Sequence, residues 1–372
     1  MMKNKRFIFN TLFSGALLAF ISFFPTITQA FETYCLPLEN GEQYVCSFVA
    51  TSPQFVKPQP VRDEFVITER YGRLADNANV YREATRNSEI VRNVGDGFLF
   101  SSIVGVFKND AGELWYMINL GEYVHQDDIK LTDQSTFRGV EITRQPTQPF
   151  GWVVARNFTP SIEPGGEPDE RFAEMLRYDF FEVYNAVEAD DGWLWYDIGD
   201  GRWINQKFVS LVDVDSRPEG IGENDLWVEV DVFEQTLAAY EGDQMVFATL
   251  ISSGLNRWPT YQGLYNVDAD NRFVARKMSG AEGQVDYYFV EDVPHTMYFD
   301  LNTGMALHGA YWHDRFGYKH SHGCVNMPPQ DSEWVYYWSE DRGDTDFFVY
   351  VWESDPTGYF DRHDPVDPFA GA

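Results

Sequence analysis

The sequence predicts a mainly β protein, and three observations lead to this class. The stretch from Gly112 to Leu131 recurs eighty positions later as Gly192 to Leu211, with short alternating runs in both copies. From Leu226 onward, further runs alternate apolar and polar residues between glycine-containing turns. One segment, Gln330–Trp338, has the features of a short helix, because two prolines stand directly before it.

The first thirty residues have the pattern of a secretory signal peptide. Three basic residues, Lys3, Lys5 and Arg6, precede an apolar run from Phe7 to Phe24, and small residues precede a cleavage point after Ala30. We expect cleavage there, with an uncleaved membrane anchor as the alternative. Cleavage changes the formal charge from −30 to −33, because three of the 28 Lys and Arg are lost. The expected location is outside the cytoplasm, in the periplasm or cell wall.

The acidic charge limits the kinds of partner that the protein can have. The formal charge of −30 is spread along the chain, and no basic block follows the first six residues. Such a field repels the phosphates of nucleic acids and anionic lipids. We therefore expect no nucleic-acid partner and, after signal cleavage, no membrane partner.

Cysteine usage separates two residues from a third. Residues 31–60 predict a loop-rich lead-in with scattered prolines, and they contain Cys35 and Cys46. An exported protein lies where these two thiols can pair, so we expect a disulfide, with two unpaired thiols as the alternative. Cys324 then has no partner, and a lone exported thiol is either buried and inert or kept because it reacts.

The internal repeat predicts two small β-barrels, at residues 61–135 and 136–213. The copies share glycines, a Leu-Trp-Tyr run and hydrophobic positions, and both contain hairpin turn residues. Their aromatic residues are interpreted as barrel core, since small sheets depend on large side chains for burial, with a ligand platform as the alternative. These aromatic residues are Trp115, Tyr116, Trp195 and Tyr196.

The remaining chain predicts a linker, a β-rich domain and an irregular tail. Residues 214–224 contain a proline and two glycines, which are typical of linkers. Residues 225–353 contain a hairpin that turns at Glu241-Gly242-Asp243, a strand that ends at His308 and a final buried strand, Phe347–Trp352. Residues 354–372 are rich in Asp and Pro and are expected to be irregular.

The segment that carries chemistry runs from His308 to Met327. Four of the seven histidines, His308, His313, His320 and His322, lie close before Cys324. A thiol is a weak nucleophile at neutral pH until a base removes its proton. An imidazole can take that proton and later return it to a leaving amine. We therefore expect Cys324 to be a nucleophile, with one of these histidines as its base.

The run S-H-G-C-V-N at residues 321–326, with His308-Gly309 upstream of the cysteine, resembles the active-site signature of the L,D-transpeptidases. These cysteine enzymes cross-link or modify bacterial peptidoglycan. The resemblance implies a β-rich catalytic domain with a short helix after the cysteine, acting on peptidoglycan stem peptides through a thioester and an amine acceptor. The resemblance assigns the role of nucleophile to Cys324 and that of base to His308, and it assigns the Gly309 carbonyl to orienting the His308 ring. We expect no cofactor and no metal.

The two copies resemble bacterial SH3-like domains, which commonly precede wall enzymes. Their shared pattern is a short strand with Trp-Tyr, a glycine turn and an aromatic residue next to a branched one. The resemblance implies two SH3-like β-barrels, with peptidoglycan binding as a hypothesis.

Further residues around the cysteine have expected roles. Backbone N–H groups at a tight turn can stabilise an oxyanion, so we assign this role to Gly323 and Cys324. His322 is expected to hold the loop, or alternatively to polarise the thiol. The residues expected on the substrate side are Ser321, Asn326, Arg315, Tyr311 and Trp312.

Three alternatives remain open from the sequence. Water in place of the amine acceptor would make the same residues an L,D-carboxypeptidase. The histidines and Cys324 include zinc-ligand types, although their spacing, H-x4-H-x6-H-x-H-x-C, matches no standard site. A non-catalytic protein that binds the cell wall as a scaffold is the third alternative.

Overall fold

The structure is a computed structural model that describes residues 54–58, 70–280, 287–340 and 345–355, together with the backbone of 31–37 and 44–50. The expected signal peptide lies outside the described residues, as does most of the tail. The lead-in at residues 31–60, expected to be loop-rich, contains three strands among its described residues. The chain divides into two compact units, residues 1–53 and 54–372.

The first unit contains one antiparallel hairpin. Strand β1 (Phe31–Pro37) pairs with β2 (Tyr44–Ala50), and Cys35 is in register with Cys46. Directly opposite residues of an antiparallel pair lie at a Cα separation that a disulfide can span. The side chains themselves lie outside the described part, so the expected disulfide stays a prediction.

A seven-stranded sheet, here called the β21 sheet, forms one half of the C-terminal region. Its order is β24-β29-β21-β22-β23-β12-β3. All six residues of β21 are buried, as in a strand covered on both faces. The expected turn at Gly242 joins β22 to β23, and the expected final strand is β29. The strand bounds are β3 (Phe55–Val56), β12 (Val140–Ile142), β21 (Leu226–Asp231), β22 (Thr236–Glu241), β23 (Gln244–Leu250), β24 (Gly263–Asn266) and β29 (Phe347–Trp352).

A second seven-stranded sheet, the β27 sheet, has the order β11-β4-β7-β26-β27-β28, with β25 also paired to β26. Its longest strand, β26, runs without a break from Tyr288 to Asp300. His308 lies near the end of β27, as the sequence predicts. The bounds are β4 (Arg70–Leu74), β7 (Phe98–Ile103), β11 (Ile129–Leu131), β25 (Arg272–Ser279), β26 (Tyr288–Asp300), β27 (Met305–Gly309) and β28 (Val325–Met327).

A helix and a shared apolar core join these two sheets. Helix α1 (Pro329–Glu340) begins at a proline, a residue suited to the first helical turn, and covers the expected Gln330–Trp338. Its residues Val335, Tyr336 and Tyr337 belong to a core that also includes side chains from β21, β22, β26, β27, β28 and β29. Across the described residues, no helix is both long and apolar enough to span a bilayer.

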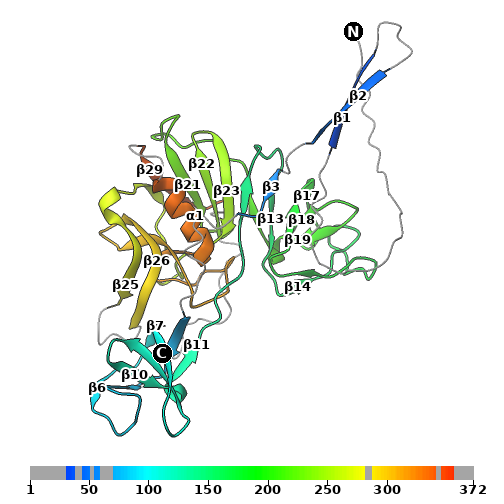
Figure 1. Ribbon diagram of the computed structural model, residues 1–372. Helices are drawn as coiled ribbons and strands as arrows, with labels where there is room; N and C mark the ends of the chain where they lie inside the picture. The colour runs from blue at the N-terminus through cyan, green and yellow to red at the C-terminus, as the bar shows by residue number, and fades with distance from the viewer. Residues whose placement is uncertain are drawn as a thin grey trace. The chain divides into compact units, whose positions relative to one another are not determined.

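The first copy of the repeat contributes strands to two sheets (Figure 1). A five-stranded sheet, β6-β5-β10-β9-β8, packs over β4, β7 and β11 of the β27 sheet around Val80, Leu99 and Ile118. This copy is therefore continuous with the sheet that carries His308. The new elements are β5 (Asn79–Tyr81), β6 (Ile90–Asn93), β8 (Gly105–Lys108), β9 (Leu114–Asn119), β10 (Glu122–His125) and the 3-10 helix η2 (Gln126–Asp128).

The second copy has its own small sheets around Val153, Ile198 and Ile204. Its elements are β13 (Phe150–Val153), β14 (Asn157–Phe158), β15 (Met175–Leu176), β16 (Phe180–Glu182), β17 (Asn185–Glu188), β18 (Leu194–Asp197), β19 (Trp203–Asn205), η3 (Gln206–Phe208) and β20 (Val209–Val212). Strand β12 lies within the range expected for this copy, but it pairs with β23 of the β21 sheet.

The same local structure recurs in both copies eighty positions apart. His125 and Asn205 cap their 3-10 helices by accepting the N–H of Asp127 and Lys207. The backbone N–H of Ala75 bonds to the carbonyl of Asp128, and that of Ala155 bonds to the carbonyl of Phe208. Trp115 and Trp195 are both buried, as expected for core residues. The two copies are thus similar in structure as well as in sequence. That they are SH3-like domains stays a prediction. The remaining 3-10 helix among the described residues is η4 (Ala269–Asn271).

Candidate active site

Cys324 and His308 lie at the junction of two parallel strands. His308 on β27 is in register with Asn326 on β28, and Cys324 stands two positions before Asn326. Side chains in register on parallel strands point to the same face, so His308 and Asn326 share one face, and Cys324 stands just before β28 begins. The thiol also accepts a hydrogen bond from the backbone N–H of Ala306, two residues before His308. The two side chains expected to react therefore lie at neighbouring places along β27.

The His308 ring is held by the backbone carbonyl of the next residue. Its Nδ1 lies 3.0 Å from the carbonyl oxygen of Gly309, and the side chain is buried. Since a carbonyl can only accept, Nδ1 carries the proton and Nε2 presents a lone pair. Burial lowers the pKa of His308 to about 4, against the opposing hydrogen bond to Gly309. This ring is therefore a neutral imidazole whose basic nitrogen is Nε2.

Glycine at position 309 is required by close packing against α1. A Cβ at this position would lie 2.5 Å from Oγ of Ser332 and 2.8 Å from Cγ of Pro294. Neither distance is tolerated by a real side chain, so the backbone that holds His308 can come this close to the helix only as glycine.

The thiol of Cys324 is uncharged in the resting protein. The side chain is half-buried, and its Sγ lies 3.6 Å from the carbonyl of Gly304. Burial raises the pKa of Cys324 to about 11, while the hydrogen bond from Ala306 lowers it. With a neutral imidazole beside a neutral thiol, the proton must move to His308 as the sulfur attacks.

The loop before β28 is held by the hydroxyl of Ser321. Ser321 Oγ donates to the carbonyl of Cys324 and accepts the N–H of Gly323 at 3.1 Å. Gly323 has a φ of 111°, which favours glycine. The expected oxyanion role of Gly323 needs correction, because its N–H is already used inside the loop. The N–H of Cys324 is left as the donor that this turn offers to an oxyanion.

Thr260 is a site residue that the sequence did not reveal. Its side chain is 6% exposed, accepts the N–H of Gly254 at 2.9 Å and donates to the carbonyl of Gly323 at 2.9 Å. This second bond fixes the plane of the peptide between Gly323 and Cys324, and so the direction of the Cys324 N–H. A single threonine in an irregular loop carries no sequence signal for this role.

Aromatic rings form the walls near the thiol. The His322 ring stacks on Trp258 with centroids 3.8 Å apart, and its centroid lies 5.1 Å from that of Tyr288. The pKa of Tyr288 is raised mainly by burial and also by the thiol of Cys324. The pKa of Tyr298 is likewise raised by burial, and Cys324 contributes in the same direction. The sequence did not indicate that Tyr288, Trp258 or Tyr298 lies at the site.

Several residues expected on the substrate side support the loop instead. Tyr311 is 0% exposed and Asn326 is 2% exposed, and Ser321 is also buried. The Asn326 amide lies 3.1 Å from Nε2 of His313, whose Nδ1 accepts the N–H of Arg315 at 3.2 Å. The pKa of His313 is lowered, first by burial and then by His320 beside it.

Trp312 and Arg315 remain partly exposed. Of the five residues expected to meet substrate, only these two keep an exposed side chain. Within the described ranges, no three His, Cys, Asp or Glu side chains are grouped to hold a metal ion.

Comparison with known proteins places this site in a family. Residues 225–351 match the family model of the YkuD L,D-transpeptidase catalytic domain. The matched segment is similar to L,D-transpeptidase catalytic domains. It contains β21–β29 and α1, and with them Cys324, His308 and Thr260.

Individual relatives of the catalytic domain cover part of the chain. The Bacillus subtilis (strain 168) protein YciB, provisionally named an L,D-transpeptidase, is 28% identical over 127 residues, which are 31% of this chain and 62% of YciB. A crystal structure of a cysteine-to-serine mutant of the Enterococcus faecium L,D-transpeptidase is 26% identical, with 36% of this chain and 50% of that chain covered and a TM-score of 0.30. An L,D-transpeptidase from Mycobacterium smegmatis is 15% identical, with 58% and 90% covered and a TM-score of 0.31. The chain thus spans about half to two thirds of the length of the first two proteins.

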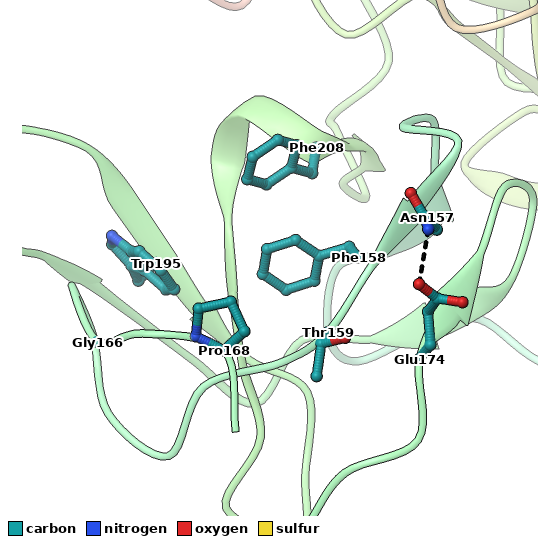
Figure 2. Close-up of a pocket in the computed structure, with 8 residues that line it drawn as sticks. All are labelled: Asn157, Phe158, Thr159, Gly166, Pro168, Glu174, Trp195 and Phe208. Carbon is teal, nitrogen blue, oxygen red and sulfur yellow. Dashed lines mark hydrogen bonds between the residues drawn. The ribbon is translucent and has the colours of Figure 1, made fainter. Parts of the chain in front are cut away.

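A separate cavity lies in the second copy of the repeat, outside the catalytic domain (Figure 2). Its volume is about 410 Å³. The rings of Phe158 and Phe208 lie side by side in it, 4.8 Å apart, and Asn157 donates to Glu174 at 2.6 Å on its polar side. The first copy has Ala78 and Asp128 at the positions of the two phenylalanines. The second copy therefore has an aromatic pocket at a place where the first copy has none of these rings.

Proposed function

We propose that this protein is an exported cysteine transpeptidase that acts on peptidoglycan stem peptides through a thioester acyl-enzyme. One observation carries the proposal: the thiol of Cys324 accepts the N–H of Ala306 on β27, the strand that also carries His308, whose Nδ1 is bonded to the Gly309 carbonyl. The L,D-transpeptidase catalytic domain at residues 225–351 supports the reaction class.

The first half of the proposed reaction forms a thioester. As the sulfur of Cys324 attacks the carbonyl carbon of the donor amide, its proton passes to Nε2 of His308. The carbonyl oxygen takes the negative charge and is stabilised by the N–H of Cys324, whose direction Thr260 fixes. The carbon–nitrogen bond then breaks, and His308 returns the proton to the leaving amine, which is the terminal D-alanine of a stem tetrapeptide.

The second half of the proposed reaction transfers the acyl group. The acceptor amine attacks the thioester carbon and gives a proton to Nε2 of His308. The carbon–sulfur bond breaks, and the proton returns to the Cys324 sulfur. Water in place of the amine gives a trimmed peptide by the same steps, which is the carboxypeptidase alternative.

Product analysis tests this proposal and separates its alternatives. The purified protein is incubated with a tetrapeptide muropeptide and an amine acceptor, and the products are identified by mass spectrometry. A joined product with one equivalent of released D-alanine is expected. Trimmed peptide alone would replace the transferase with the carboxypeptidase, and no change in the peptide would support the non-catalytic scaffold.

Export is the second part of the proposal and has its own test. It rests on the basic residues, apolar run and small residues before Ala30. Expression of the full chain in a bacterial host, followed by fractionation and N-terminal sequencing, should recover a protein outside the cytoplasm that begins at Phe31. Recovery of the intact N-terminus in the membrane fraction would instead indicate an uncleaved anchor.

A further inference from the structure

One continuous sheet connects the first copy of the repeat to the active site. Strand β7 of that copy runs parallel to β26, with Phe98, Leu99 and Phe100 opposite Tyr288, Phe289 and Val290 (Figure 1). Further along, at Met297–Asp300, β26 pairs with β27, which carries His308. Since Tyr288 lies beside His322, pairing with β7 fixes a residue in the wall of the site.

A ring stack makes a second connection between the same parts. Tyr71 on β4 stacks on Tyr311, with ring centroids 3.6 Å apart and an angle of 11° between the planes. Both rings are buried, in a core shared with Phe98, Phe100 and Val293. Tyr311 stands two residues after the end of β27, and its hydroxyl donates to the carbonyl of Glu291 on β26 at 2.6 Å. The first copy therefore packs against the segment that follows His308 and holds it in place.

One further aromatic ring connects Tyr311 to His308. Trp312 packs its edge against Tyr311, with centroids 5.1 Å apart, and its ring centroid lies 5.7 Å from that of His308. The rings of Tyr71, Tyr311, Trp312 and His308 thus form one contiguous series. A buried stack has little room to relax, so loss of its outer member is transmitted to its neighbours.

We propose that Tyr71 is a positioning residue for His308, and that the first copy is a built-in part of the active site. Tyr71 touches neither thiol nor substrate; it fixes Tyr311 and Trp312, which set where the imidazole stands relative to Cys324. The inference rests on the proposed role of His308 as base. It concerns residues 70–131, which lie outside the matched catalytic domain.

The test uses the full chain and a readout that needs no peptidoglycan. The rate at which iodoacetamide alkylates Cys324 is measured from pH 5 to 10, with peptide mass spectrometry to follow that cysteine alone. His308→Ala is the reference for a thiol without its base, and a fall of about 100-fold at pH 7 is expected for it. Tyr71→Leu should move the profile toward this reference, with a fall of about tenfold at pH 7, because small misplacement of a catalytic group is costly.

Two matched variants distinguish a role of Tyr71 in positioning His308 from a general contribution of Tyr71 to the stability of the fold. Tyr71→Phe keeps the stacked ring and should give the wild-type profile. Tyr81→Leu removes another buried tyrosine of the same copy, which packs on Trp115 and not on Tyr311, and should also keep the wild-type profile. All variants are compared at a temperature where circular dichroism shows them folded. If Tyr71→Leu does not fold, Tyr71→Met, which fills more of the same space but supplies no ring to stack on Tyr311, should shift the profile in the same direction.

The outcomes distinguish this inference from the proposed function. A wild-type profile in His308→Ala overturns the role of His308 as base, and with it the proposed function. A changed profile in His308→Ala with a wild-type profile in folded Tyr71→Leu, or in Tyr71→Met if Tyr71→Leu does not fold, overturns the inference alone. An equal shift in Tyr71→Leu and Tyr81→Leu also overturns it, because general loosening of the copy would then explain both.

Discussion

Replacing Thr260 by valine removes a buried hydroxyl while keeping the shape of the side chain. In the wild type this hydroxyl accepts the N–H of Gly254 and donates to the carbonyl of Gly323, each at 2.9 Å. Valine leaves both backbone groups without this partner, at a cost of about 1–3 kcal/mol for each buried group left unsatisfied. We therefore expect Thr260→Val to lower the free energy of unfolding by roughly 2–6 kcal/mol.

The same substitution should slow acylation. Without Thr260, the peptide between Gly323 and Cys324 can rotate, and the Cys324 N–H no longer points steadily at the oxyanion. Full loss of one such donor costs about 2.7–4 kcal/mol of barrier, so partial loss should slow acylation by about 10- to 100-fold. The assay is the single-turnover rate of acyl-enzyme formation with a tetrapeptide muropeptide, together with urea unfolding.

Serine at position 260 is the matched control, because it keeps the hydroxyl and loses only a methyl group. Thr260→Ser should acylate within about threefold of the wild type, since a small loss of packing is all that separates them. The reasoning would be refuted by wild-type acylation in folded Thr260→Val, or by equal losses in the serine and valine variants.

Two further predictions concern a buried carboxyl group and the second copy. Burial raises the pKa of Asp331 from 3.8 to about 7, so the folded state holds a proton that the unfolded state has released between these pH values. The free energy of unfolding should therefore fall by about 4 kcal/mol as pH rises from 4 to 7. Urea unfolding should show that this fall is absent in Asp331→Asn. An equal fall in the wild type and in Asp331→Asn would contradict this prediction. Phe158→Ala with Phe208→Asp gives the second copy the residues of the first, Ala78 and Asp128. In a Cys324→Ala background this double variant should bind peptidoglycan sacculi about tenfold more weakly, and unchanged retention would exclude the aromatic pocket as a wall-binding site.

Local patterns in the sequence were sufficient to predict many of the turns, strands and the helix of the catalytic domain. The turn at Gly242, the final strand β29 and helix α1 follow from alternation, turn residues and a proline at the helix start. The motif around Cys324 and the upstream His308 could also be located, because both are fixed by short-range spacing on strands that end at one edge. The YkuD match over residues 225–351 agrees with the family resemblance.

Contacts between distant segments were beyond what the sequence could show. Nothing local specifies that β7 pairs with β26, or that β12 joins β23, since the choice of strand partner depends on the assembled sheets. The burial of Tyr311 follows from Tyr71, which lies 240 positions away, so this tyrosine had been assigned to the substrate side. The use of the Gly323 N–H by Ser321 is likewise a property of the folded loop.

Intact-protein mass spectrometry after mixing with a tetrapeptide muropeptide tests the central claim most directly. The wild type should gain the mass of the muropeptide minus D-alanine, on the peptide that contains Cys324, and the added mass should be released by hydroxylamine as a thioester. Cys324→Ala should gain nothing under the same conditions. Equal added mass on both proteins, or none on a folded wild type that still converts the muropeptide, would contradict the account.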